Sequence, residues 1–367
     1  MKKRISVYVK GDRNSASYYR IYQYIDNVSD VKKIYHLMCS PYLHNRFFPI
    51  SIQPLIIKII IYLNMFGRML WALIEDTISR PDVIIVHRRI LVHYMPSFFF
   101  GFLRLMIYRG SRLVWDYDDN ILEAKEISKK NFETMACLSS VIVVTHENLS
   151  SLVSKQYKHK IRILPTTDGD MYKSYISHQK EITQFRINSL HSEISLVWVA
   201  TSSNMKYLEH ITPILDEVGK NLEETQNRQL TLHVICDKPL LQKTKYLKVM
   251  NIKWSRKAAI NGMLSSSIGI MPLEDNTFTR GKGGFKLVQY QSVGLPCIGS
   301  AVGFNCEVIQ KGSGYAVNNT YEDWNTAIQR ISNVEHYIDY SIESYKNWWV
   351  NFNYESNLIF WKSLILE

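Results

Sequence analysis

The chain has 367 residues, 46% of them hydrophobic and 12% aromatic, which suits two folded domains and excludes disordered and fibrous proteins. Its five cysteines show no CxxC or Cys/His spacing, so the sequence indicates neither a disulfide framework nor a zinc site. Only five residues, 5–9, precede Lys10 as an apolar run, too few for a secretory signal peptide. We therefore expect a first β-strand of a cytoplasmic protein.

The positive charge of the chain is concentrated in its first third. Residues 1–115 contain 17 Lys and Arg against 6 Asp and Glu, whereas residues 116–367 contain 27 of each. Such an imbalance predicts an anionic partner for the first third. The basic residues alternate with long aliphatic runs, a pattern that favours a membrane surface and speaks against nucleic acid.

Two stretches of this region, residues 50–74 and 90–108, are unusually apolar. Both carry a Lys or Arg, which costs roughly 2.5–3.5 kcal/mol at the centre of a membrane-spanning helix. Pro96 and Gly101 also interrupt the second stretch. Helices lying in the membrane interface fit better than spanning helices, and core-facing helices of a soluble domain fit equally well.

Short β-branched runs alternate with helical patterns over residues 1–168, which predicts a Rossmann-like domain of parallel βαβ units. The expected strands cover residues 5–9, 33–38, 82–87, 112–115, 141–145 and 162–164. The expected helices cover residues 18–27, 55–79, 127–138 and 147–156.

Polar side chains follow the predicted strands of this first domain, at the edge where α/β sheets bind ligands. Ser15, Ser17 and Arg20 follow the first strand and are candidates for binding an acidic ligand, together with Arg13; an ordinary capped helix start explains them equally well. His87 lies at the end of another predicted strand, and a histidine without a visible partner is more often structural.

Three acids, Asp116, Asp118 and Asp119, come directly after the strand at 112–115. Carboxylates this close repel one another unless a cation, a basic partner or raised pKa values compensate. A divalent metal ion is one interpretation. Pairing with Arg13, Arg88 or Arg89 is the other.

Residues 165–193 lose the apolar periodicity, as expected for a connector with a loose helix. A second Rossmann-like domain follows over 190–345, and residues 346–367 form an aromatic-rich helical tail. The expected strands of the second domain cover residues 195–200, 230–236, 252–254, 268–271 and 297–300. The expected helices cover residues 205–219, 257–264 and a segment beginning at Phe285.

A basic, glycine-rich turn, Arg280–Gly284, opens the helix that begins at Phe285 and stops at Gly294. Glycines let backbone N–H groups approach an anion, and a helix N-terminus aims further N–H groups at the same place. With Lys282 and Lys286 as countercharges, the pattern is typical of phosphate binding. A solvated basic loop is the alternative.

The segment 269–314 contains the string MPLEDNTFTRGKGGFKLVQYQSVGLPCIGSAVGFNCE. It resembles the donor-binding half of family 4 glycosyltransferases of GT-B fold, and within that family a bacterial surface-polysaccharide branch. The resemblance implies two Rossmann-like domains that face each other across a cleft, with a C-terminal helix that crosses back onto the first domain. It also implies a nucleotide-diphosphate-sugar donor, retention of configuration, and no metal or other cofactor.

The resemblance assigns the site residues in three groups. Catalytic roles fall to Lys282, Lys286 and Asp118. Donor binding falls to Thr201, Ser202, Arg280, Lys282, Gly284, Phe285, Lys286 and Gln289. Acceptor binding falls to Ser15, Ser17, Arg20, Arg88, Asp118 and Asp119.

The chain departs from the family at two glutamates eight residues apart, where it carries Gly281 and Gln289. Gln289 retains a hydrogen-bonding amide for ribose hydroxyls, but Gly281 cannot replace a carboxylate. The 201–204 turn also lacks the family's arginine, and only Lys206 lies near it.

The sequence therefore predicts a glycosyltransferase acting on a glycan or lipid-linked acceptor during capsule, O-antigen or exopolysaccharide assembly. Its expected location is the inner face of a membrane, with peripheral association through the basic, apolar first domain. A nucleotide-sugar epimerase or hydrolase of the same fold is one alternative. A non-catalytic partner subunit, suggested by Gly281, is another. The nucleotide, sugar, acceptor and linkage are not specified.

Overall fold

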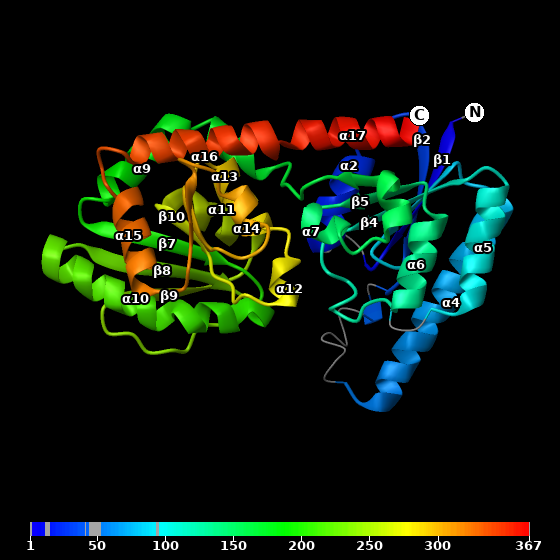
Figure 1. Ribbon diagram of the computed structural model, residues 1–367, viewed down its shortest axis with the longest axis horizontal. Helices are drawn as coiled ribbons and strands as arrows, with labels where there is room; N and C mark the ends of the chain where they lie inside the picture. The colour runs from blue at the N-terminus through cyan, green and yellow to red at the C-terminus, as the bar shows by residue number, and fades with distance from the viewer. Residues whose placement is uncertain (1, 12–14, 41, 44–52, 93–94, 367) are drawn as a thin grey trace. The chain divides into compact units, whose positions relative to one another are not determined.

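The computed structural model describes residues 2–11, 15–40, 42–43, 53–92 and 95–366, except the side chain of Ser15. The chain divides into two compact units. Unit 1 comprises residues 1–166 and 355–367, and unit 2 comprises residues 167–354. Each unit contains one six-stranded parallel sheet, which confirms the predicted α/β class (Figure 1).

The sheet of unit 1 has the strand order β2-β1-β3-β4-β5-β6, and all its pairings are parallel. Every strand lies at a predicted place, with boundaries shifted by one or two residues. The strands are β1 (Lys3–Val9), β2 (Val31–Leu37), β3 (Val83–His87), β4 (Arg112–Tyr117), β5 (Val141–Val144) and β6 (Ile161–Ile163).

The helices of unit 1 include α4 (Leu55–Ser79), α5 (Ser97–Tyr108) and α6 (Lys129–Leu138). The first helical segment is divided into α1 (Ser15–Ser17), a π-helical turn η1 (Tyr18–Tyr22) and α2 (Gln23–Ile25). The helix predicted over 147–156 is wrong in its second half. It is replaced by α7 (Glu147–Ser150) and a 3₁₀ segment, η3 (Lys155–Lys160), in a serine-rich stretch where hydroxyls compete for backbone groups: Ser151 Oγ donates to Asn148 O.

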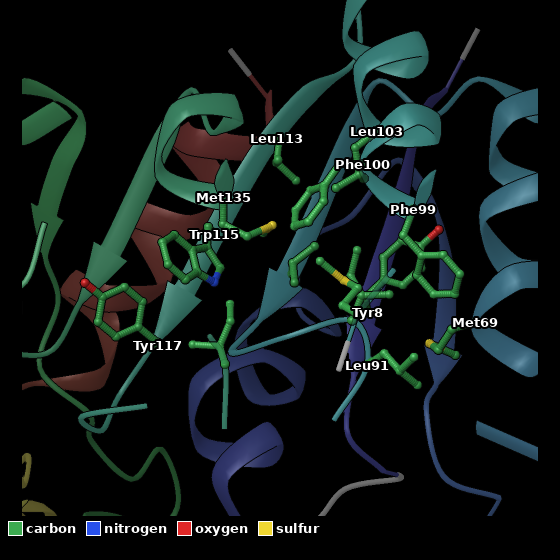
Figure 2. Packing of buried hydrophobic residues seen from close by; sticks show 14 of the residues in the cluster. Tyr8, Met69, Leu91, Phe99, Phe100, Leu103, Leu113, Trp115, Tyr117 and Met135 are labelled. Atoms are coloured by element: carbon green, nitrogen blue, oxygen red, sulfur yellow. The ribbon is translucent and has the colours of Figure 1, made fainter. Parts of the chain in front are cut away.

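One core of unit 1 is built on aromatic side chains from β4 and α5. Trp115 and Tyr117 of β4 lie beside Met135 of α6, and Phe99 and Phe100 of α5 extend the same cluster (Figure 2). All five are buried. This packing fixes β4 at the centre of the sheet, where its last residues lead into the acidic segment.

Helix α4 is attached to the sheet by a polar anchor as well as by apolar packing. Buried Asp76 accepts hydrogen bonds from Ser6 Oγ and Tyr8 OH, both at 2.7 Å. His36 Nε2 lies 3.1 Å from the same carboxylate. Among the described residues, α4 is the one helix long and apolar enough to cross a membrane by length and composition, and 22% of its most apolar 18-residue window is buried.

Helix α17 (Tyr354–Leu366) returns to unit 1 from residue 355 onward. Arg112 Nη2 donates to Leu364 O at 2.9 Å, and Asn357 Nδ2 donates to Pro165 O at 2.8 Å. Trp361 is fully buried and stacks on Tyr24. The predicted crossing of the C-terminal helix back onto the first domain is thus confirmed.

The sheet of unit 2 has the order β12-β11-β10-β7-β8-β9 and is also parallel. The strands are β7 (Glu193–Val199), β8 (Gln229–Cys236), β9 (Leu247–Lys253), β10 (Ile268–Met271), β11 (Cys297–Ser300) and β12 (Gly314–Val317). The sequence predicted β10 and β11 with their observed bounds. It missed β12, which has only three apolar residues after its initial glycine.

Two hydrophobic cores cover this second sheet. One contains α10 (Met205–Gln226) and α15 (Tyr321–Ile331), and the other contains α11 (Arg256–Ser265), α13 (Phe285–Ser292) and α16 (Tyr337–Asn351). Helix α10 runs seven residues past its predicted end at Gly219 because its apolar face continues to buried Leu222. The other α-helices of unit 2 are α8 (Met171–Ile176), α9 (Gln179–Ser189), α12 (Thr277–Arg280) and α14 (Asn305–Val308).

Candidate functional site

In each sheet there is one pair of neighbouring strands from which the chain continues to strands on opposite sides. In unit 1 this pair is β1 and β3, and in unit 2 it is β7 and β10. Ligands of α/β proteins bind at the carboxyl ends of such strand pairs. The predicted site residues follow these strands or the adjacent β4, so the topology places them at the edges where binding is expected.

The glycine-rich turn of unit 2, Gly281–Gly284, lies between α12 and α13. Gly284 is the N-cap of α13 and has φ +59°, a left-handed conformation that favours glycine. A Cβ at Gly284 would also lie 2.9 Å from Val308 Cγ2. The N-terminal amides of an eight-residue helix therefore follow a turn that only glycine adopts without strain.

Buried contacts hold α13 against the sheet. Tyr290 OH donates to Ile270 O on β10 and accepts from Val199 N on β7, both at 3.2 Å. Its ring occupies the space beside Gly269, where a Cβ would lie 2.4 Å from the ring. At the other end of α13, Arg186 Nη1 donates to the carbonyl oxygens of Val293 and Gly294. The helix is thus fixed at the strand pair where the sheet reverses its connections.

Lys282 joins the two predicted donor-binding loops. Its Nζ donates to Asn204 Oδ1 at 2.9 Å and lies over the rings of Phe278 and Tyr207, 5.0 and 5.8 Å from their centroids. Asn204 belongs to the turn that also contains Thr201 and follows β7. The structure therefore brings together the 201–204 turn and the glycine-rich turn, although Asn204 and Lys282 are 78 residues apart in the sequence.

A polar network centred on the buried side chains of Gln289 and Asp168 underlies α13. Lys286 Nζ donates to Gln289 Oε1 at 2.8 Å, and Gln289 Nε2 donates to Asp168 Oδ2 at 2.7 Å. Asp168 is fully buried and accepts from both terminal nitrogens of Arg256, at 2.6 and 2.7 Å. Both ends of the Gln289 amide are thus engaged within the protein, because Oε1 accepts from Lys286 and Nε2 donates to Asp168.

The pKa values of this network follow from its burial and charges. Burial lowers the pKa of Lys286 to about 8, although Asp168 acts in the opposite direction. Burial would raise the pKa of Asp168, but the hydrogen bonds and charge of Arg256 outweigh it and hold that pKa below its usual value. Near neutral pH the network therefore holds an ionised carboxylate and a lysine poised close to its titration.

The other predicted donor residues of unit 2 have internal partners. Ser202 donates through its amide and its hydroxyl to Asp237, at 2.6 and 2.7 Å, and Arg280 forms an exposed bidentate pair with Asp275. Thr201 Oγ1 lies 2.8 Å from Ser203 Oγ. The amide and the hydroxyl of Ser202, which could donate to a bound anion, thus donate to the carboxylate of Asp237 in this structure.

In unit 1, Asp116 at the end of β4 is the centre of a buried ion-pair cluster. It is fully buried and accepts from Nε and Nη2 of Arg20, which is itself buried. His87 Nδ1 lies 2.8 Å from Asp116 Oδ2. Arg20 Nη1 donates in addition to Leu164 O and Thr166 Oγ1. Direct acceptor binding by Arg20 does not fit this placement, because all three guanidinium nitrogens are engaged within unit 1.

The next two acids pair with Arg88, one of the alternatives that the sequence left open. Arg88 Nε donates to Asp118 Oδ1 at 2.7 Å, Nη2 to Asp119, and Nη1 to Glu126 at 3.2 Å. Burial would raise the pKa of Asp118, but Arg88 and then His87 outweigh it and keep the carboxyl ionised. Over the described residues, no three His, Cys, Asp or Glu side chains are grouped to hold a metal ion.

The remaining acceptor predictions lie around the first helical segment. Ser17 is fully buried at the end of α1. The side chain of Ser15 and all of Arg13 lie outside the described part of the structure. Their assignment to acceptor binding remains a prediction.

Sequence reasoning missed several members of these clusters: Asp116 as partner of Arg20, His87 as partner of Asp116, and Asp168, Arg256 and Asp237 in unit 2. A strand end could have indicated Asp237, since it directly follows a β-branched run, whereas for His87 the strand end was recognised and only its partner was missed. No local pattern marks Asp168 or Arg256, because these two partners are 88 residues apart in the sequence.

No family model and no curated protein matches the chain. Solved structures are similar in fold. Anabaena HepE, solved in complex with UDP and glucose, matches with a TM-score of 0.60 at 12% identity, over 100% of this chain and 98% of that one. A glycosyltransferase from Rickettsia africae matches with a TM-score of 0.62 at 12% identity, over 100% and 99%. The fold is GT-B.

An epimerase is similar to the chain in fold, as the glycosyltransferase is. UDP-GlcNAc 2-epimerase from Methanocaldococcus jannaschii matches with a TM-score of 0.53 at 13% identity, over 90% of this chain and 93% of that one. At these identities the likeness establishes the GT-B architecture alone. The chemistry depends on the residues at the sheet edges.

Proposed function

We propose that this protein is a glycosyltransferase that transfers a sugar from a nucleotide-diphosphate-sugar donor, with unit 2 binding the donor. The observation that carries the proposal is the left-handed Gly284 at the N-terminus of α13, with Lys286 in the first turn of this helix and Lys282 hydrogen-bonded to the 201–204 turn. Helix amides and lysines stabilise the diphosphate leaving group as its charge develops. Solved structures of the same fold that hold UDP support this choice of ligand class.

The finer features of the proposal follow the resemblance to family 4. The transfer would retain the configuration of the sugar and proceed without a metal ion, because Lys282 and Lys286 supply the positive charge. Asp118, held ionised by Arg88, would orient an acceptor hydroxyl. We further propose a glycan or lipid-linked acceptor in bacterial surface-polysaccharide assembly, at the cytoplasmic face of a membrane.

Calorimetric titration of the purified protein with UDP, GDP and ADP tests the donor site. We expect one nucleoside diphosphate to bind, and Lys282→Ala and Lys286→Ala each to weaken it by about tenfold or more. Lys257→Ala, in the exposed first turn of α11, serves as the matched control and should bind normally. Absence of binding by any nucleotide, or equal loss in the control, would contradict the proposal.

A nucleotide-sugar epimerase is the second candidate, favoured by the likeness to UDP-GlcNAc 2-epimerase. The two activities differ in their need for an acceptor. Turnover of a nucleotide sugar by the pure protein without acceptor would favour the epimerase. Turnover that requires a lipid-linked or glycan acceptor would favour the transferase, and nucleotide binding without any turnover would favour a non-catalytic subunit.

A further inference from the structure

Helix α4 has a wide apolar face that the described residues of unit 1 leave exposed. Ile56, Ile60, Leu63, Trp71 and Ile78 recur at helical spacing on one side of α4, and each is between 55% and 77% exposed. We call these five residues the α4 face. The opposite side of the helix carries its buried residues, so α4 is apolar on both sides although only one side contacts the core. Exposed apolar surface of this extent marks an interaction site.

Helix α5 continues the exposed apolar surface beside α4. The rings of Phe66 on α4 and Phe98 on α5 are 6.3 Å apart, and the two helices lie side by side in Figure 1. Phe98, Leu105 and Tyr108 are exposed on α5. The N-terminal turns of α4 extend past the end of the sheet in the same view (Figure 1). Ile56 and Ile60 in these turns are 72% and 55% exposed.

The charges around this surface are almost all positive. Over residues 55–80 and 97–109, the exposed charged side chains are Arg68, Arg80, Arg104, Arg109 and Glu75. Four cations against one anion complement a negatively charged partner. A second copy of the chain would bring the same cations against one another, whereas anionic lipid headgroups would neutralise them.

We infer that the α4 face inserts into the surface of an anionic lipid bilayer, with α4 lying in the plane of the membrane. This inference rests on the proposed function, which places the protein at a membrane, and it identifies the surface that would contact the lipid. Trp71 and Tyr108 suit the headgroup level, where aromatic rings with a polar atom are favoured. A spanning α4 is disfavoured, because it would pull Asp76 away from Ser6 and Tyr8 and place this carboxylate in hydrocarbon.

Sedimentation of the full chain with lipid vesicles tests the inference. We expect binding to vesicles of phosphatidylcholine with phosphatidylglycerol, much weaker binding to phosphatidylcholine alone, and weakening by high salt. The variant Ile56→Gln/Ile60→Gln/Trp71→Gln should bind anionic vesicles at least about tenfold more weakly. The matched control Ile338→Gln/Ile342→Gln/Trp349→Gln removes two isoleucines and one tryptophan from the exposed side of α16 and should bind normally.

Three outcomes would overturn the inference. The first is equal vesicle binding by the wild type and the α4 variant, or equal loss in both triple variants. The second is equal binding to neutral and anionic vesicles. The third is a dimer, seen by sedimentation velocity without lipid and dispersed by the α4 variant, which would assign the face to a second copy. Urea unfolding of both variants checks that they fold, and no nucleotide or sugar is present, so the result is independent of the donor titration.

Discussion

The two charged clusters at the sheet edges differ in what balances their cations. In unit 1 the guanidinium groups of Arg20 and Arg88 pair with the carboxylates of Asp116 and Asp118. In unit 2 the hydrogen bonds of Lys282 and Lys286 described above end on the amide oxygens of Asn204 and Gln289. A carboxylate neutralises its partner, whereas an amide oxygen orients an ammonium group and leaves its charge in place.

This difference assigns different tasks to the two edges. The paired cluster of unit 1 fixes the ends of β3 and β4 and has little net charge to offer a ligand. The lysines of unit 2 keep a positive field in front of the α13 amides, where a diphosphate would gain from both. Arg256 and Arg280 of the same unit are balanced by Asp168 and Asp275, so the distinction concerns the lysines and not the whole unit.

The largest expected effect is on stability, from removing the charge of Asp116. Asp116→Asn keeps the size of the side chain and leaves Arg20 buried without its countercharge. We expect a loss of about 3–5 kcal/mol in the free energy of unfolding, measured by urea denaturation. Asp275→Asn, which breaks the exposed pair with Arg280, should leave the urea midpoint unchanged. Similar midpoints for both variants would remove the distinction between fixed and exposed pairs.

Gln289→Glu tests whether unit 2 depends on a neutral partner for Lys286. The new carboxylate would face Asp168, whose Oδ2 accepts from Gln289 at 2.7 Å. We expect a cost of roughly 1–3 kcal/mol at pH 7 by urea denaturation. Because this contact raises the folded-state pKa of the new carboxyl, the cost should shrink at pH 5, where protonation removes the repulsion.

The double variant Asp168→Asn/Gln289→Glu supplies the control for this change. It restores a donor opposite an acceptor, and it should recover part of the loss if the two side chains interact directly. Additive losses in the double variant would contradict the network. Arg256 limits the recovery, because it loses its bidentate carboxylate.

Gly284→Ala probes the turn that opens α13. The left-handed conformation at φ +59° costs an L-residue about 1–2 kcal/mol, and the Cβ would press on Val308. We expect a loss of that size in unfolding free energy. Gly101→Ala on α5 has no atom within 4 Å of the added Cβ and should instead gain about 0.5–1 kcal/mol. Equal effects at the two glycines would show that the turn has no special backbone requirement.

The smallest expected effect is a pH dependence of nucleotide affinity. With its pKa lowered to about 8, Lys286 loses its charge between pH 7 and pH 9, where an ordinary lysine keeps it. Affinity for a nucleoside diphosphate should therefore fall several-fold over this range, measured by calorimetry. Lys286→Arg stays charged and should bind with the same affinity at both pH values. A flat profile for the wild type would separate Lys286 from the diphosphate.

Much of the fold could be predicted because its strands are short apolar runs bounded by Gly, Pro or charged residues. Ile268–Met271 and Cys297–Ser300 have the predicted bounds, and Leu55–Ser79 is the predicted helix. The errors occur where the chain has no apolar run with clear boundaries of this kind. The serine-rich segment after Ser150 leaves the helix early, and Gly314–Val317 forms a strand only by pairing with β11.

The candidate site was predictable only in part, for a reason of sequence distance. Parallel strands bring their carboxyl ends to one edge, so the 201–204 turn and the glycine-rich turn could be expected to meet. The partners of individual side chains could not. Gln289 and Asp168 are 121 residues apart, and Arg20 and Asp116 are 96 apart. Such pairs depend on how the elements pack, which no local pattern encodes.

The return of α17 to unit 1 has a consequence for biosynthesis. A ribosome delivers Trp361, whose ring stacks on Tyr24, only after all of residues 167–354 have been made. At about 5–20 residues per second, this interval lasts roughly 10–40 s. During that time all six strands of the first unit have been synthesised, but α17 is missing. The surface around Arg112 and Tyr24 that α17 contacts is therefore exposed. Unit 1 is therefore begun first but completed last. Until α17 has been made, the surface that α17 contacts is a site that chaperones can shield.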